Sequence, residues 1–156
     1  MKIVIDSREQ KPLFKNGVVK KLDVGDYSIY GLEDKICIER KSLTDLFGTL
    51  GQGHQRFKKE LQRAMKLDYF AIVVDGDFTK IQTKNFDGAE FIKMEGGTVT
   101  KILMTLHHKY KINMFFTKGR NDSKRLIRSL FESYIILQDS KILQGNTTTQ
   151  NTKVIK

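Results

Sequence analysis

The sequence is poor in cysteine and has no long apolar run. Cys37 is the only cysteine, so an internal disulfide is excluded and a reducing compartment is favoured. No segment has the length and apolar character of a transmembrane helix, and the first residues read as a short strand rather than a signal peptide. We therefore expect a cytoplasmic protein that is neither secreted nor bound to a membrane.

Several familiar catalytic patterns are also absent. The histidines, His54, His107 and His108, do not form a zinc-binding pattern with Cys37. There is no phosphate-binding glycine loop, and no Ser/His/Asp or Cys/His arrangement with a useful signal. These absences argue against a zinc site, a nucleotide-binding loop and a hydrolase of the triad type.

Positive charge is abundant. The 156 residues carry a net charge of +10 and the pI is about 9.7. Such a balance favours a polyanionic partner, and nucleic acid fits better than a membrane surface. The alternative is a lysine-rich, well-solvated surface, and charge alone places nucleic-acid binding only slightly ahead of it.

Hydrophobic patterning predicts an α/β fold, with a mixed central sheet flanked by helices on both faces. We expect strands at 2–6, within 18–24, and at 27–30, 36–41, 69–74 and 112–117, and helices from about 42, at 54–67, 98–110 and 122–137. Residues 76–97 are left unassigned, with Gly96-Gly97 as a break. Residues 1–137 then form one domain, and the polar segment 138–156 is predicted to be a flexible tail.

The strands at 27–30 and 36–41 read as a β-hairpin, whose register follows from the alternation of side chains. Pairing Tyr27 with Ile38 gives one apolar face and one largely polar face. The apolar face carries Tyr27, Ile29, Ile36 and Ile38, and the other carries Asp26, Ser28, Cys37, Glu39 and Lys41. This register places Asp26 opposite Glu39, with Cβ atoms roughly 4.5–5.5 Å apart. Two carboxylates at that distance repel unless a cation sits between them.

A divalent metal that activates water against a phosphodiester needs such a pair of acids, with a nearby cation for the phosphate. Each residue also has a structural interpretation. Asp26 is a candidate turn aspartate, and Glu39 with Lys41 a plain salt bridge. Ser42-x-x-Asp45 matches a helix capping box, and we expect Asp45 both to cap the helix and to reach the metal or its water.

The charged residues around Asp26, Glu39 and Asp45 each have more than one possible role. Arg40 should point to the opposite face, either for structural pairing or to reach a phosphate round the sheet edge, whereas Lys41 would stabilise charge on the phosphate. A second cluster contains Asp6, Arg8 and Glu9 and is either an extension of the site or a charged loop. The basic helix at 54–67, with Arg56, Lys58, Lys59 and Arg63, is either a phosphate-backbone track or a solvated face.

These motifs resemble a known family. Gly25-Asp26, Glu39-Arg40-Lys41 and Asp45 reproduce the G-D-xn-E-R-K-x3-D signature of the XPF-type structure-specific endonucleases. Residues 5–9 resemble the family's V-D-x-R-E element, and the resemblance covers about residues 2–117. It implies a restriction-endonuclease-like fold and Mg²⁺- or Mn²⁺-dependent cutting of branched DNA, such as flaps and forks, near junctions.

Carried over by position, the resemblance makes Asp26, Glu39 and Asp45 the metal-binding acids and has Arg40 and Lys41 act on the phosphate. Asp6, Arg8 and Glu9 would complete the site, and Arg56 is the candidate for an arginine that the family carries after the motif helix. Larger members add a tandem helix-hairpin-helix domain, where this sequence predicts only a helix and a polar tail. Small members resembling this chain occur in phages and mobile elements, so we expect a bacterial or phage-infected host.

Family members usually work as dimers, and the last predicted helix suits such a contact. Its apolar residues form one stripe at Leu126, Leu130, Tyr134 and Leu137 and another at Ile127, Phe131 and Ile135, wider than one sheet face needs. The main hypothesis is thus a homodimeric, metal-dependent DNA endonuclease of repair, recombination or replication. The alternatives are a catalytically silent DNA-binding or dimerisation module of the same fold, and a protein that binds or cleaves RNA.

Overall fold

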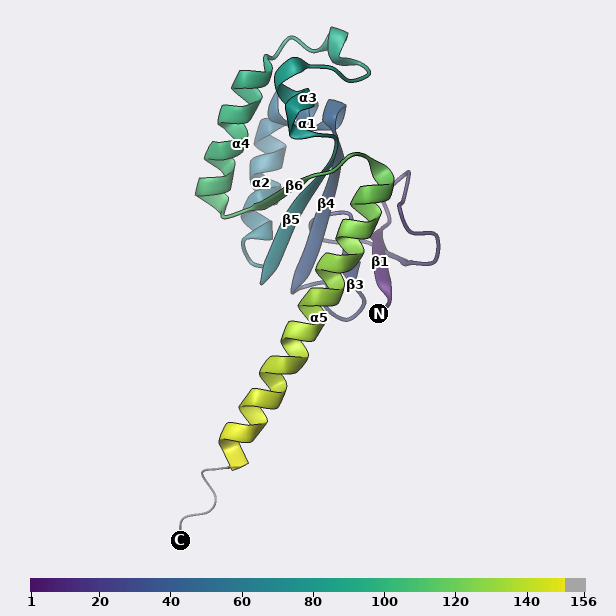
Figure 1. Cartoon of the computed structure of the whole chain (residues 1–156), viewed down its shortest axis with the longest axis vertical. Helices are drawn as coiled ribbons and strands as arrows, with labels where there is room; N and C mark the ends of the chain where they lie inside the picture. Colours follow the sequence, from purple (N-terminus) through teal and green to yellow (C-terminus); the bar gives the residue numbers. More distant parts are fainter. Residues whose placement is uncertain (151–156) are drawn as a thin grey trace.

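A six-stranded sheet forms the centre of residues 1–150, the part of the chain that the computed structural model describes, with side chains described up to residue 143 (Figure 1). In chain order the elements are β1 (Ile3–Asp6), β2 (Val18–Lys20), β3 (Tyr27–Ile29), β4 (Ile36–Ser42), α1 (Leu43–Leu50), α2 (His54–Ala64), β5 (Tyr69–Asp75), α3 (Phe78–Thr83), the 3₁₀ turn η1 (Ala89–Phe91), α4 (Gly96–Tyr110), β6 (Asn113–Phe116) and α5 (Arg120–Gln150). No helix in this range is both long and apolar enough to cross a membrane.

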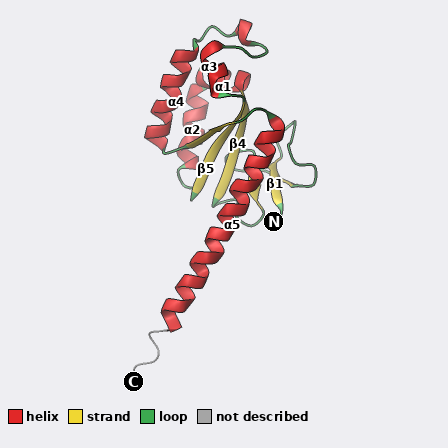
Figure 2. Cartoon of the chain, in the orientation of Figure 1, coloured by secondary structure: helices red, strands yellow, loops and turns green. Residues whose placement is uncertain are grey.

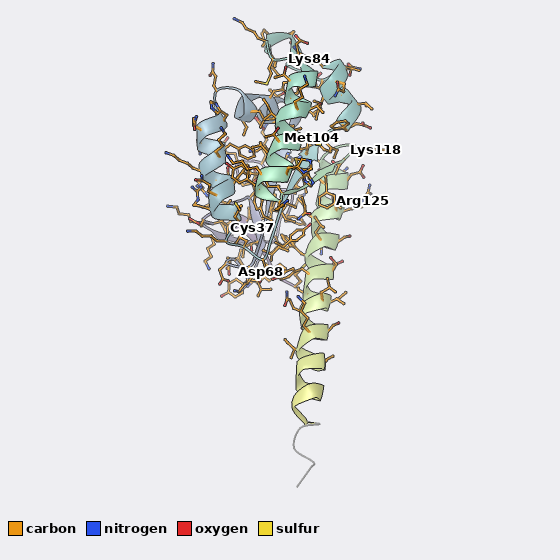
Figure 3. All side chains as sticks on the ribbon, turned by 90° about the vertical axis from the view of Figure 1, so that its left-hand side faces the viewer. Cys37, Asp68, Lys84, Met104, Lys118 and Arg125 are labelled. Carbon is orange, nitrogen blue, oxygen red and sulfur yellow. The ribbon has the colours of Figure 1, made fainter. Side chains whose placement is uncertain are left out.

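The strands run in the order β2-β1-β3-β4-β5-β6, and the sheet is mixed, as predicted. β3 is antiparallel to β1 and β4, while the pairs β1–β2, β4–β5 and β5–β6 are parallel. Helices cover both faces: α1, α2, α3 and α4 lie on one side and α5 on the other (Figure 2). Side chains fill the space between these layers (Figure 3).

The hairpin register is confirmed. Tyr27 pairs with Ile38, Ser28 pairs with Cys37, and the Asp26 amide donates to the Ile38 carbonyl at 2.9 Å. The predicted apolar face packs beneath Ile127 and Phe131 of α5. The opposite face was predicted to be largely polar, but its Cys37 and Ser28 side chains are fully buried. Packing of α1, α2 and α4 over this face leaves only its Asp26–Glu39 end beside a cavity.

The segment left unassigned contains two short elements. Asp77 caps α3 by accepting a hydrogen bond from the Thr79 amide at 2.9 Å, and η1 follows. The predicted break at Gly96-Gly97 is instead the first turn of α4. The reason is close contact with α3, since a Cβ atom on Gly96 would lie 2.0 Å from the Ile81 carbonyl oxygen. Glycine here permits close packing and does not interrupt the helix.

Helix α5 is longer than predicted. The prediction that it ends near Leu137 is wrong, because the helix continues to Gln150 through most of the segment assigned to a flexible tail. Residues 151–156 of that predicted tail lie outside the described residues. The first half of α5 packs on the sheet, with Ile127 and Phe131 completely buried, and the second half extends past the body of the molecule (Figure 1).

Candidate active site

A cavity of about 880 Å³ opens where β3 and β4 meet α1 and α2. Four of the five residues predicted to be catalytic line this cavity: Asp26, Glu39, Lys41 and Asp45. The hairpin supplies the first three, and the first turn of α1 supplies the fourth. Positive side chains from the loop after β1 and from α2 form the other wall. The tertiary structure therefore brings the acidic motif and a set of cations to one cavity.

Asp26 and Glu39 share the buried end of this cavity. The Asp26 Oδ2 atom accepts a hydrogen bond from the Arg40 amide at 2.8 Å, and Glu39 is only 8% exposed. Burial raises the pKa of Asp26 to about 6. Burial, followed by the charge of Asp26, raises the pKa of Glu39 to about 8. Both shifts mean that two negative charges are costly here without a compensating cation.

Lys41 supplies part of that compensation. Its Nζ atom donates to Glu39 Oε1 at 2.6 Å and lies 5.1 Å from the centre of the Phe57 ring. Burial lowers the pKa of Lys41, but the charge of Glu39 and its hydrogen bond outweigh this and hold that pKa above its usual value. The salt bridge between Glu39 and Lys41, which was the structural alternative to a catalytic role, is therefore present. It also keeps an ammonium group at the edge of the cavity.

Asp45 takes the capping role. The Ser42 hydroxyl accepts from the Asp45 amide at 3.1 Å and donates to the Asp45 carboxylate at 2.7 Å. The Asp45 carboxylate is exposed to the same cavity. However, among the described residues no three His, Cys, Asp or Glu side chains come close enough together to hold a metal. The predicted cap is present, and the prediction that Asp45 also reaches the metal or its water stays a prediction.

The remaining pair suits a hard divalent cation. Mg²⁺ is typically bound through one or two carboxylates, with waters and substrate phosphates completing its coordination. Asp26 and Glu39 are oxygen donors whose mutual repulsion such an ion would relieve. The cavity extends beyond these two carboxylates and is lined there by further polar side chains. The donor set thus fits Mg²⁺ or Mn²⁺.

Arg40 lies on the opposite face of the sheet, as the pleat predicts. Its guanidinium forms an ion pair with Asp75 on β5, and its Nη1 atom lies 3.8 Å from Glu9. Neither Arg40 nor Glu9 lines the cavity. The structural pairing predicted as one role for Arg40 is thus present, and Glu9 lies outside the cavity lining, although its charge contributes to the raised pKa of Asp26.

Asp6 and Arg8 form a brace at the cavity edge. Buried Asp6 accepts hydrogen bonds from the Arg8 amide, from Nε and Nη2 of the same residue, and from the Leu22 amide. Burial alone would raise the pKa of Asp6, but these donors lower it overall. With both of its oxygens engaged, Asp6 anchors Arg8, and both residues line the cavity.

Helix α2 presents one basic face to the cavity. Phe57, Leu61 and Ala64 are buried, as predicted. The 3.6-residue period then turns Arg56, Lys59 and Arg63 toward the cavity. Lys58 points elsewhere and lines a separate, smaller cavity of about 160 Å³ near α4. Three of the four predicted DNA-binding side chains are thus brought to the site.

Three acidic residues at or near the site were missed in the sequence. Asp23 lines the cavity, and its carboxylate lies 3.8 Å from Arg63 Nε. Glu60 lies on the cavity face of α2, and its charge acts on Asp26, Glu39 and Lys41. Its spacing from Arg56 and Arg63 would have placed it there. Asp75 ends the buried strand β5 and pairs with Arg40, but no local pattern indicated which residue it meets.

Comparison with known proteins identifies relatives of this arrangement. A family model for the ERCC4 domain matches residues 5–130. Among solved structures, XPF from Aeropyrum pernix is similar, with a TM-score of 0.65, 22% identity, and coverage of 86% of this chain and 61% of the other. The same archaeal protein in complex with DNA gives a TM-score of 0.66, 21% identity, and coverage of 86% and 64%. No curated protein sequence matches.

The structural likeness confirms the restriction-endonuclease-like fold. This chain spans about three fifths of the length of each of those two structures. The match to residues 5–130 takes in both hairpin acids, the capped helix α1 and the basic helix α2.

Proposed function

Because the chain belongs to the ERCC4 domain family, as an XPF-type nuclease domain, we propose that it is a metal-dependent endonuclease that hydrolyses phosphodiester bonds in branched or junction-containing DNA, such as flaps and forks. The observation that carries this proposal is the buried Asp26–Glu39 pair beside Lys41, in a cavity whose other wall is cationic. The similarity to the structure of XPF from Aeropyrum pernix in complex with DNA supports DNA as the substrate.

The residues of the cavity have separable roles. Asp26 and Glu39 would hold Mg²⁺ or Mn²⁺, which as a Lewis acid lowers the pKa of water and polarises the phosphate. Lys41 stabilises negative charge that develops on the phosphate, because its ammonium group is already fixed beside Glu39. Arg8, Arg56, Lys59 and Arg63 bind neighbouring phosphates and orient the strand. The brace from Asp6 holds Arg8 in place for this task.

The deciding experiment compares labelled duplex, single-stranded, 3′-flap, forked and splayed DNA, each with Mg²⁺, Mn²⁺ or EDTA. We expect cutting near the junction that needs the metal. Salt-sensitive binding without cutting in either metal would instead favour the silent DNA-binding module. Matched RNA substrates in the same assay test the RNA-cleaving alternative, which we expect to fail. We propose a role in repair, recombination or replication and, from the resemblance to small phage and mobile-element members, a location in the cytoplasm of a bacterial or phage-infected cell.

The cavity face of α2 predicts which lysine contacts DNA. Lys59 lines the cavity whereas its neighbour Lys58 does not, although both carry the same charge. Reversing the charge with Lys59→Glu should weaken DNA binding and reduce the slope of log affinity against log salt by about 1. Lys58→Glu, the matched control, should leave that slope nearly unchanged. Equal effects of the two changes, measured by fluorescence anisotropy, would contradict the assignment.

We also propose a homodimer through α5. Both predicted apolar stripes contact the sheet: Ile127 and Phe131 are buried, and Leu126, Leu130 and Tyr134 pack against the same hydrophobic cluster. Ile136, Leu137 and Ile142 remain 60–64% exposed on the extending half of the helix. Light scattering should give a mass of twice the 18.0 kDa chain, and Leu137→Asp should lower it. A monomeric mass for the wild-type chain at working concentration would refute the dimer.

A further inference from the structure

Arg40 forms hydrogen bonds on both faces of the sheet. On the cavity face, its backbone amide donates to Asp26 Oδ2 at 2.8 Å. On the other face, its Nε atom donates to Asp75 Oδ2 at 2.8 Å, and its Nη2 atom contacts the same oxygen. The two side chains are only 12% and 6% exposed. One residue of β4 therefore links an acid of the proposed site to a buried ion pair on the far side.

The ion pair continues into α5. The second oxygen of Asp75 accepts a hydrogen bond from the Ser123 hydroxyl in the first turn of that helix. Ser123 is fully buried, and its Oγ atom lies 2.8 Å from Thr117 Oγ1. The Thr117 backbone amide in turn donates to the Val74 carbonyl at 3.1 Å. A chain of contacts thus runs from α5 through Asp75 and Arg40 to the carboxylate of Asp26.

Such a buried pair is a poor source of stability, because desolvation of both charges offsets much of their attraction. It does define geometry, since the planar guanidinium and a carboxylate with both oxygens engaged allow few alternative arrangements. Arg40 stands between Glu39 and Lys41, so its orientation sets the backbone that carries both. Small displacements of reacting groups are costly in catalysis.

We propose that Asp75 and Ser123 are positioning residues for the proposed nuclease site. Acting through Arg40, they hold the β4 segment that presents Glu39 and Lys41, together with the amide that orients Asp26. The proposal rests on the proposed function and assigns Arg40 itself to positioning, with no contact to the phosphate. It also makes the packing of α5 on the sheet a requirement for full activity.

The test uses Ser123→Ala, Asp75→Asn and Arg40→Lys in the full chain, with Ser133→Ala as the control. Ser133 lies on the same helix, and within the described part of the chain its hydroxyl donates only to the Leu130 carbonyl. We expect Ser123→Ala and Asp75→Asn to lower kcat on a forked substrate by about 10- to 100-fold at unchanged KM. Ser133→Ala should match the wild type. Unfolding curves, recorded in parallel, correct each rate for the fraction of folded protein.

A double mutant separates positioning from phosphate contact. If Ser123 acts through Arg40, adding Ser123→Ala to Arg40→Lys should lower kcat little further, because interacting residues are not additive. Fully additive losses would overturn the proposal. So would wild-type kcat in Ser123→Ala and Asp75→Asn after correction for folding, which would leave these residues a purely structural role.

NMR spectroscopy tests the positioning role of Ser123 without any DNA cleavage. The Arg40 amide signal in NMR spectra reports its hydrogen bond to Asp26, and Ser123→Ala should shift that signal while Ser133→Ala should not. An unshifted signal would overturn the inference even in an active enzyme. If instead the wild-type chain cuts no DNA, the proposed function fails, while a shifted Arg40 signal still supports the physical link from α5 to Asp26.

Discussion

Replacing Glu39 by glutamine should abolish cleavage of forked DNA while leaving DNA binding intact. Glutamine has nearly the same shape but carries no negative charge, so the pair with Asp26 no longer holds a divalent cation. Loss of one such electrostatic group costs about 10²–10³-fold in rate, and we expect at least this. DNA affinity should persist because the cationic wall from Arg8 and α2 is untouched.

Single-turnover cleavage and anisotropy, recorded on the same protein, measure the two quantities. Glu90→Gln is the matched control, because Glu90 is exposed on η1 and does not line the cavity. It should cleave at the wild-type rate. More than a tenth of the wild-type rate in Glu39→Gln would remove Glu39 from the proposed chemistry.

The second large effect is expected from Lys41→Met, which keeps the aliphatic stem and removes the ammonium group. Cleavage should fall by about 10²-fold or more, since the ammonium group fixed beside Glu39 is lost. The folded protein should also lose stability. Glu39 would lose its buried hydrogen-bond partner, which costs about 1–3 kcal/mol, because a carboxyl whose pKa is already raised to about 8 takes up a proton instead of staying charged.

The two consequences are measured separately. Chemical denaturation gives the free energy of unfolding, and part of its loss should be restored by Mg²⁺, which replaces the missing positive charge between the carboxylates. Lys58→Met, a change on the face of α2 away from the site, is the control. Unchanged stability and cleavage in Lys41→Met would contradict both the salt bridge and the role of Lys41 at the phosphate.

These predictions rest on a hairpin whose geometry could be derived from the sequence. Alternation along two short strands specifies one register, and that register places Asp26 opposite Glu39 whatever covers the sheet. The cap at Ser42 and the buried face of α2 are equally local, because both depend on residues three or four positions apart. Agreement with the structure is therefore closest where neighbours in the chain decide the conformation.

Contacts across the sheet were beyond such patterns. Glu9 pairs with Arg40 and does not line the cavity. The Asp6 carboxylate accepts hydrogen bonds from Arg8 and from the Leu22 amide. The end of α5 was also misjudged, because a polar composition suggested a tail although helical hydrogen bonds continue through residues 138–150. In each case the residue type was recognised, but its partner or backbone state depended on elements distant in the sequence.

The sequence by itself determined the mixed α/β class, the paired acids of the hairpin, the lysine beside them and the basic character of α2, because these follow from periodicity, register and charge. Only the tertiary structure decided that Arg40 braces the far face through Asp75 and Ser123, that Lys58 lies outside the cavity, and that Glu60 faces into it. The physical reason is that side-chain partners are set by the packing of α2 and α5 on opposite faces of the sheet, which no local pattern specifies.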